Sequence, residues 1–305
     1  SAVIADWSGA AYDSKRHRLI LWGGGHNGYY GNELYAFNVP TLKWERLTDP
    51  GKPRDNAYKV CGPLNADGSP VSRHTYNTLA YIAHADRFFG HGGSLACGHG
   101  SSGFGTTWTF DFAAMKWQQM KPKGTFPPGT VSSFCAYDPE TKKIWYHDGN
   151  LNRPKKWGLY DYDYDSNTWT KHTSEACCGQ TCVVEPRKRL LIGVGNGHVY
   201  RWDIGRGEFA RRELKTTGGD AVVKPRNPGL AFDPVSRKIV AWHGGLVHTL
   251  DLETMKWKAH EAEGAPEPAR WGTFGRWQYS PPVDAFIVVN DIDQDVHFYK
   301  LGEGR

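Results

Sequence analysis

One pattern recurs six times along this chain: an apolar strand, a short polar turn and a second apolar strand. The turn often contains Asp-Pro, as in residues 135–147 (CAYDPETKKIWYH) and 230–242 (LAFDPVSRKIVAW). We number each copy from its first residue, so that position 1 is Ala10, Leu79, Cys135, Cys182, Leu230 and Trp277. Successive copies are therefore 69, 56, 47, 48 and 47 residues apart. A period near 50 residues indicates one small structural unit repeated along the whole chain.

Two further strand-like stretches follow most copies, and the second usually carries a tryptophan. Alternation is clearest in YDYDYD (160–165), which has the period of two expected of a strand. The aligned aromatic residues are Trp44, Trp117, Trp169, Phe209 and Trp257. We interpret them as packing between sheets, not as a sugar-binding platform. Four antiparallel strands per repeat predict an all-β, six-bladed β-propeller that forms a single domain over residues 1–305.

The sixth repeat ends at VHFYKLGEGR (296–305), which supplies a third strand but no fourth. An open sheet edge invites aggregation, so the ring is expected to close. The N-terminal segment AVIAD (2–6) can supply the missing outer strand, and we predict that it does.

Composition excludes several classes of protein. The net charge is +5, with Lys and Arg scattered among acidic residues, which disfavours a nucleic-acid partner. No apolar run approaches the roughly 18 residues of a membrane span. The chain opens at Ser1 on an apolar stretch, which suggests that a targeting segment was removed. We expect a secreted or periplasmic monomer.

The six cysteines require separate interpretations. Cys135 and Cys182 occupy position 1 of consecutive copies and are expected in the core. Cys61 and Cys97 lie in long loops on one face, and a disulfide between them would imply an oxidising compartment. A short cluster follows the third copy: Cys177, Cys178 and Cys182, with His172 nearby. It could hold structural zinc, but buried or paired structural cysteines are favoured.

Functional sites in propellers gather on the face shared by two sets of loops, those joining blades and those joining the second and third strands. The longest loops belong to the first two repeats, and they include residues 23–33 and 92–106. We therefore place the candidate site over the first two blades.

A pair of histidines is the most suggestive feature of this face. His74 precedes the first strand of the second copy and His91 ends its second strand, so adjacent antiparallel strands bring them to one rim. Arg73 and Tyr76 flank His74, and His147 has the place of His91 in the third copy. The candidates for substrate binding on the same face are Arg73, His26, Tyr30, Asn32, His147, Asn150, Arg153 and His243, and Arg226 lies across the channel.

The whole chain resembles the kelch and galactose-oxidase-like propeller superfamily. The resemblance rests on glycine pairs after the second strand (Gly92–Gly93, Gly244–Gly245), on third-strand aromatic residues and on the fourth-strand tryptophan. The fourth and sixth repeats depart from it, since GVGNGH and VNDIDQ lack the glycine pair.

The paired histidines also resemble those of propeller polysaccharide lyases, of the ulvan-lyase and rhamnose–glucuronate-lyase kinds. The resemblance implies β-elimination on an acidic, uronate-containing polysaccharide, with His74, His91, Tyr76 and Arg226 as the catalytic group. In that chemistry an Arg or Asn neutralises the carboxylate, while His or Tyr removes the α-proton and protonates the leaving oxygen. Those families are longer and seven-bladed, and their Tyr–Arg pair has no residue-by-residue match here.

Other interpretations stay open. His74 and His91 could be satisfied structural residues, and the chain could be a non-catalytic propeller that binds a glycan or a protein on its loop-rich face. A copper oxidase is a distant third, because Cys135 and Cys182 occupy core positions. The run NDIDQD places Asp291, Asp293 and Asp295 like the start of a calcium loop, although a solvated turn is favoured.

Overall fold

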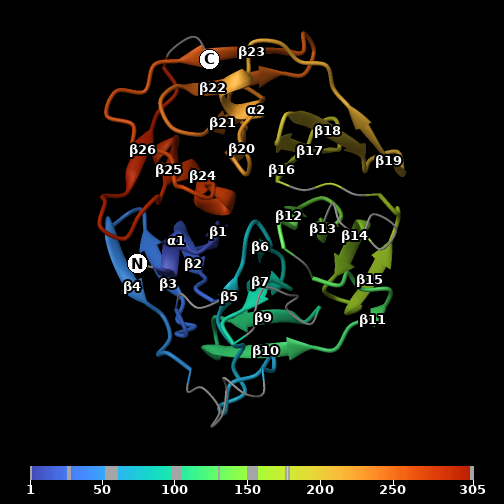
Figure 1. Ribbon diagram of the computed structural model, residues 1–305, viewed down its shortest axis with the longest axis vertical. Helices are drawn as coiled ribbons and strands as arrows, with labels where there is room; N and C mark the ends of the chain where they lie inside the picture. Colours follow the sequence, from blue (N-terminus) through green and yellow to red (C-terminus); the bar gives the residue numbers. More distant parts are fainter. Residues whose placement is uncertain are drawn as a thin grey trace.

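Six sheets surround a central channel in the computed structural model, as the repeat predicts (Figure 1). The structure describes residues 2–25, 29–51, 61–97, 105–129, 131–149, 157–175, 177 and 179–302. The strands nearest the channel are the first strands of the six copies. The fold class is thus the all-β, six-bladed propeller expected from the sequence.

The first three blades each contain four strands, which run from the channel outward. Blade 1 consists of β1 (Gly9–Asp13), β2 (Arg18–Trp22), β3 (Tyr35–Asn38) and β4 (Lys43–Arg46). Blade 2 consists of β6 (Leu79–Ile82), β7 (Arg87–His91), β9 (Thr107–Asp111) and β10 (Lys116–Met120). Blade 3 consists of β12 (Phe134–Asp138), β13 (Lys143–Asp148), β14 (Gly158–Asp163) and β15 (Thr168–Lys171), and β11 (Lys123–Gly124) adds a short parallel strand at its outer edge.

The next two blades have four strands, and the sixth has three in the described part of the chain. Blade 4 consists of β16 (Thr181–Glu185), β17 (Leu190–Gly195), β18 (His198–Asp203) and β19 (Glu208–Glu213). Blade 5 consists of β20 (Gly229–Asp233), β21 (Lys238–Trp242), β22 (Val247–Asp251) and β23 (Lys256–His260). Blade 6 consists of β24 (Trp277–Ser280), β25 (Ala285–Val288) and β26 (His297–Tyr299). A separate two-stranded ribbon pairs β5 (Arg73–His74) with β8 (Ser94–Leu95).

The turn between the first and second strands repeats in all six blades. The residue seven after position 1 has a left-handed backbone, with φ between 46° and 60°: His17, Asp86, Lys142, Arg189, Arg237 and Asp284. In blades 1, 3, 4 and 5 an acidic residue at the end of the first strand accepts backbone N–H groups of the turn, as Asp138 does from Glu140 (3.2 Å). The polar turn of the sequence pattern is therefore a defined local structure.

The predicted N-terminal closing strand is wrong. Residues Ala2–Ala5 form the short helix α1, which packs between blades 1 and 6. Val3 and Ile4 are consecutive and both buried, which a helix turn allows but the alternating sides of an edge strand do not. Blade 6 is joined to blade 1 by side chains instead. The buried guanidinium of Arg276 donates to the carbonyl oxygen of Ser8, and the hydroxyls of Tyr12 and Ser280 are 2.8 Å apart.

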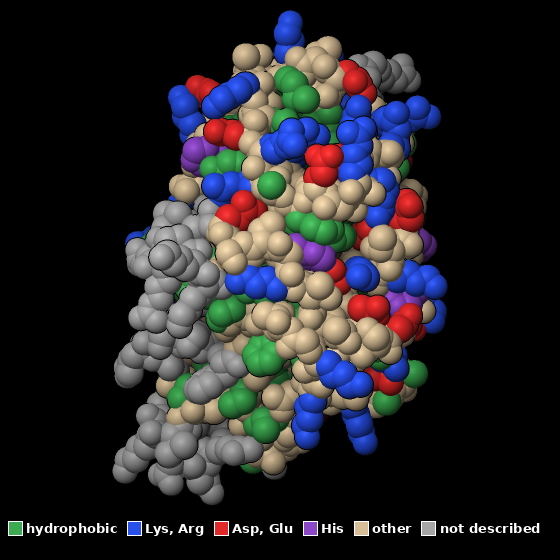
Figure 2. All heavy atoms as spheres, turned by 90° about the vertical axis from the view of Figure 1, so that its right-hand side faces the viewer, with side chains coloured by type: hydrophobic (Ala, Val, Ile, Leu, Met, Phe, Trp, Pro, Cys, Tyr) green, Lys and Arg blue, Asp and Glu red, His purple; other side chains and the backbone are tan. Residues whose placement is uncertain are grey.

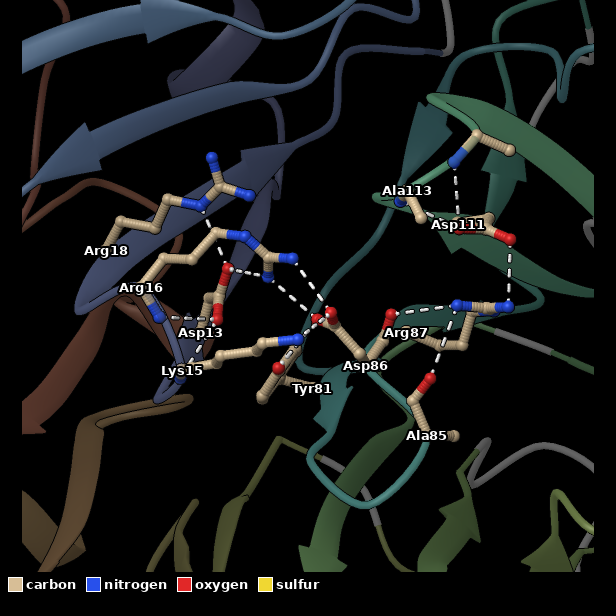
Figure 3. Close-up of polar contacts among 11 residues, drawn as sticks. Asp13, Lys15, Arg16, Arg18, Tyr81, Ala85, Asp86, Arg87, Asp111 and Ala113 are labelled. Carbon is tan, nitrogen blue, oxygen red and sulfur yellow. Dashed lines mark hydrogen bonds and ion pairs between the residues drawn. The ribbon is translucent and has the colours of Figure 1, made fainter.

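Ion pairs join blades 1 and 2 on the face formed by these turns (Figure 3). The Arg16 guanidinium of blade 1 contacts both carboxylate oxygens of Asp86 in blade 2, and Lys15 Nζ lies 2.6 Å from the same carboxylate. On the outer side of the ring in Figure 2, Lys and Arg side chains are interspersed with Asp and Glu.

The predicted disulfide is confirmed: Cys61 and Cys97 are bonded, which is typical of proteins from oxidising compartments. The predicted packing of the fourth-strand tryptophans holds for Trp169 and Trp257, which are buried, whereas Trp44 is 45% exposed. No helix in the described residues is long and apolar enough to cross a membrane.

Candidate functional site

One residue per blade has a left-handed backbone conformation at the loop-rich end of the channel. The residue three before position 1 has a positive φ, between 48° and 74°, in every blade: Trp7, Tyr76, Ser132, Gly179, Asn227 and Phe274. Backbone hydrogen bonds link several of these positions from one blade to the next, such as Tyr76 N–H to Trp7 O (2.7 Å). The large members belong to blades 1, 2 and 6, so this side of the channel end is aromatic.

Four π systems form a continuous stack on this aromatic side. The rings of His74 and Trp7 have centroids 4.7 Å apart, and those of Trp7 and Trp271 are 4.6 Å apart and nearly parallel, at 19°. The Arg270 guanidinium carbon lies 4.6 Å from the Trp271 ring centroid. The stack leads from the buried His74, 3% exposed, to Trp271, which is 41% exposed. We call these four residues the aromatic stack.

The backbone around Trp271 holds its outer end in place. The side chain of Asn227 donates to the Trp271 carbonyl oxygen (3.3 Å), and Thr273 N–H donates to the Asn227 carbonyl oxygen (2.8 Å). Gly272 has φ 121°, and a Cβ there would lie 2.6 Å from Asn227 Cβ, so only glycine fits between Trp271 and Thr273.

Three predicted residues that precede the first strand of blade 2 lie together in a buried group: Arg73, His74 and Tyr76. In the β5–β8 ribbon, His74 is opposite Ser94, and the Tyr76 hydroxyl hydrogen-bonds to the Ser94 side chain. Burial raises the pKa of Tyr76 to about 12, so its hydroxyl keeps its proton at neutral pH. Tyr76 thus has the chemistry of a hydrogen-bond donor more than that of a base.

Arg73 supports this group as a buried cation. Its guanidinium donates to the carbonyl oxygens of Val71 (3.0 Å) and Gly92 (3.1 Å) and to Thr106 Oγ1 (3.1 Å). Burial lowers its pKa to about 9, which still leaves it charged at neutral pH. These contacts tie the ribbon to the loop that follows β7, which is a positioning role.

His91 points away from His74, toward blade 3. Its Nε2 donates to the Pro127 carbonyl oxygen (3.1 Å), so its Nδ1 accepts from the Thr107 hydroxyl (2.9 Å). Thr107 Oγ1 in turn accepts from Trp169 Nε1 (3.0 Å). Both ring nitrogens are occupied, and burial lowers the pKa of His91 to about 3. His74 lies in the β5–β8 ribbon and not on a strand paired with β7, and the two imidazoles face different blades.

His147 is also buried, between blades 3 and 4. It stacks on Phe134 at 5.2 Å, and its Nε2 is 4.0 Å from a carboxylate oxygen of Glu175. Burial lowers its pKa to about 3. This position corresponds to core packing and not to the rim.

The remaining predicted residues are dispersed. Asn32 donates to Ser69 Oγ and Pro70 O inside the blade 1 loops. Tyr30 and His243 are half-buried. Arg226, which precedes blade 5, is exposed and lies beside Gly179, which precedes blade 4. His26, Asn150 and Arg153 lie outside the described residues. The sequence interpretation missed Trp7, Arg270 and Trp271. Their position just before the first strands of blades 1 and 6 was the sequence feature that could have indicated them.

In the described part of the chain no three His, Cys, Asp or Glu side chains gather as a metal site would require, although Cys177 and Cys182 pack in one cluster. His172 pairs with Asp161 (2.5 Å) and Cys177 donates to Gln180 Oε1 (2.9 Å). Cys182 lines the channel, and Cys178 is outside the described residues. On the sixth blade, Asp291 accepts backbone N–H groups from Ile292 and Asp293, as in an ordinary turn.

No family model matches the sequence, and no curated protein matches it. The case for a function therefore rests on the residues of the site themselves.

Proposed function

We propose that the protein binds an acidic glycan on its loop-rich face, with Trp271 and Arg270 as the contact residues. The aromatic stack is the observation that carries this proposal. Sugar rings present apolar C–H faces, and the part of the Trp271 indole that stays exposed beside the Arg270 guanidinium supplies a matching surface. Trp7 and His74 support Trp271 from behind, so little conformational entropy is lost when the sugar binds.

Arg270 supplies the preference for a carboxylate. Its guanidinium lies on the Trp271 ring and makes no hydrogen bond or ion pair with the described residues. A guanidinium held in this way keeps its N–H edge free for bidentate contact with a uronate. The Cys61–Cys97 disulfide supports a secreted or periplasmic setting, where such polymers occur.

β-Elimination is less well supported by the same contacts. His91 has both nitrogens occupied and a pKa of about 3, and Tyr76 has a pKa of about 12. Neither is poised to move a proton near neutral pH. Lyase activity stays a prediction, which is tested by incubating the protein with uronate polysaccharides and following the absorbance of the unsaturated product.

Binding is tested with a matched pair of polymers: polygalacturonate, and the same polymer after chemical reduction of its carboxyl groups. We expect Arg270→Gln to weaken binding of the acidic polymer about tenfold and to leave the reduced polymer unaffected. Trp271→Ala should weaken both polymers, by about three- to tenfold. The control is Arg206→Gln, which removes the same charge from a side chain that is 78% exposed on blade 4.

The proposal fails if neither polymer binds, or if Arg206→Gln lowers the affinity as much as Arg270→Gln. Release of unsaturated product that is lost in His74→Ala and His91→Ala would instead support the lyase. If the acidic polymer binds to both histidine variants and no unsaturated product forms, the result supports a propeller that binds glycan without cleaving it.

A further inference from the structure

The outer edge of blade 6 is open in the described part of the chain. Its third strand, β26, pairs with β25 on one side, and no described residue forms a strand on its other side (Figure 1). Each of the other five blades has a fourth strand at this place. An unpaired edge presents backbone N–H and C=O groups that favour the addition of a further strand.

The other blades show which kind of side chain belongs at this edge. In blade 2, Phe88 at position 10 pairs with Phe110 of the third strand, and Phe110 pairs with Trp117 of the fourth. Blades 1, 3 and 5 have the same series, which ends each time on a tryptophan. In blade 6 the series stops after Phe286 and Tyr299. The missing partner of Tyr299 is therefore expected to be aromatic.

The fourth-strand aromatic residue also covers the junction with the preceding blade. Trp117 of blade 2 lies 4.6 Å from Trp22, which is at position 13 of blade 1. Position 13 of blade 5 is Trp242, and it lines a small pocket together with Trp277 and Tyr299 of blade 6. A volume of about 60 Å³ admits only the edge of a ring. An aromatic side chain opposite Tyr299 would therefore lie across the mouth of this pocket.

The chain that leaves the preceding blade borders the same edge. In blade 3, β11 follows the last strand of blade 2 and pairs in parallel with β15, the fourth strand. In blade 5, Thr217 forms a parallel bridge with Lys256 of the fourth strand, β23. The corresponding segment before blade 6 is 262–266, and it lines the pocket together with β26. In blades 3 and 5, a fourth strand lies between these two elements.

The charge around this edge is acidic, although the whole chain has a net charge of +5. Residues 261–266 and 290–300 border the edge, and Lys300 is the one Lys or Arg among them. None of their five acidic side chains forms an ion pair with a described residue: Glu261, Glu263, Asp291, Asp293 and Asp295. A segment rich in Lys complements this charge, whereas an acidic segment is repelled.

We propose that the open edge of blade 6 binds an extended, basic segment of a partner protein. The segment adds to β26 as an antiparallel fourth strand and places an aromatic side chain over Tyr299. Backbone hydrogen bonds to the edge supply affinity, while the aromatic ring and the basic side chains supply selectivity. The surface lies at the outer edge of the ring, so strand binding is independent of glycan binding at the channel end.

A synthetic peptide tests the proposal directly. The probe is acetyl-TKVKWKVTK-amide, in which Val and Trp share one face of a strand and most Lys residues the other. Its affinity is measured by titration calorimetry. Replacing its Trp with Ala should weaken binding about tenfold, and replacing every Lys with Glu should abolish it. Replacing both Val residues with Pro keeps the charge and the indole but prevents strand pairing, and should also abolish binding.

Hydrogen exchange measured by mass spectrometry locates the bound peptide. We expect slower exchange in residues 296–302, which contain β26, because their edge amides gain partners. The outer strand of blade 4, β19, should exchange as it does in the free protein.

A matched pair of charge variants tests the acidic border. Glu263→Lys with Asp295→Lys should weaken binding of the peptide about tenfold. The control is Glu140→Lys with Glu208→Lys, which makes the same change of net charge at side chains that are 69% and 50% exposed on blades 3 and 4. It should bind within about twofold of the wild type.

The proposal is overturned if the Pro peptide or the Glu peptide binds as well as the parent peptide. It is also overturned if the two double variants lose affinity equally, or if exchange slows in β19 and not in 296–302. A second copy of this chain is the other occupant to exclude. A dimer of the protein alone that forms with rising concentration and protects residues 296–302 would replace the partner strand.

Discussion

Arg16 of blade 1 and Asp86 of blade 2 form a bidentate ion pair across the blade junction, with Nη1–Oδ1 and Nη2–Oδ2 distances of 2.7 and 2.8 Å (Figure 3). The hydrogen bonds from Arg16, and then those from Lys15 and Tyr81, hold the pKa of Asp86 well below its usual value of 3.8. A carboxyl whose pKa is lower in the folded state stabilises the fold above its unfolded pKa, and this stabilisation is lost as the pH falls toward the folded value.

Asp86→Asn should therefore lower the free energy of unfolding by about 1 kcal/mol at pH 7. The difference from the wild type should narrow below pH 3.8, as the unfolded carboxyl takes up its proton. Urea denaturation at pH 7 and pH 3 measures both values. Asp49→Asn is the matched control, since the Arg46–Asp49 pair has side chains 53% and 85% exposed and should contribute little. A difference that stays constant between the two pH values would contradict the argument.

A second pH dependence comes from His91. Burial lowers its pKa from 6.5 to about 3, so the folded protein keeps it neutral while the unfolded chain protonates it below about pH 6.5. Stability is therefore lost as the pH falls from 6.5 toward 3. His91→Gln can keep the bonds to Thr107 and Pro127 with an amide that does not titrate.

We expect the His91→Gln variant to be less stable than the wild type at pH 7, because the ring packing is lost. Between pH 7 and pH 5 it should lose about 2 kcal/mol less stability than the wild type does. Thermal unfolding across this range measures the difference. Equal slopes for the two proteins would mean that His91 titrates in the folded protein as it does in the unfolded chain.

Ring closure depends on Arg276, because the described part of blade 6 has no fourth strand. Its buried guanidinium donates to the carbonyl oxygens of Val289 (2.8 Å), Gly272 (2.9 Å) and Ser8, and so joins blade 6 to the start of blade 1. Arg276→Met keeps much of the volume but leaves buried carbonyl groups unpaired, and should cost about 3 kcal/mol. Urea denaturation measures the cost. Arg237→Met on the exposed turn of blade 5 serves as the control, and an equal effect there would show that the charge alone matters.

Much of the architecture could be predicted because each blade is a local unit. Position 1, the polar turn and the residue with a left-handed backbone seven positions later recur with one spacing in all six copies. Asp86 in blade 2 and Arg237 in blade 5 are examples of that residue. The closure could not be predicted in the same way. It depends on contacts between residues about 270 apart, such as Tyr12 with Ser280, and no repeat encodes them.

The site was harder to predict, because strand order gives the place of a backbone but not the direction of a side chain. His74 lies in the β5–β8 ribbon and its imidazole faces Trp7, whereas His91 ends β7 and its imidazole faces Pro127. Trp271 was overlooked because a single tryptophan in a blade-joining loop carries no periodic signal.

Trp7 should affect glycan binding although it lies beneath the contact residues. Its ring is held between His74 and Trp271, at 4.7 and 4.6 Å, so it fixes the position of the Trp271 indole whose exposed part contacts the sugar. Trp7→Ala removes this support and should weaken polygalacturonate binding by about three- to tenfold, whereas Trp7→Phe should preserve most of it. Trp44→Ala is the control, since Trp44 is exposed on the outer strand of blade 1. Affinity measured by titration calorimetry separates the three variants. If Trp7→Ala binds like the wild type while Trp271→Ala does not, Trp271 acts without its support, and the stack is packing alone.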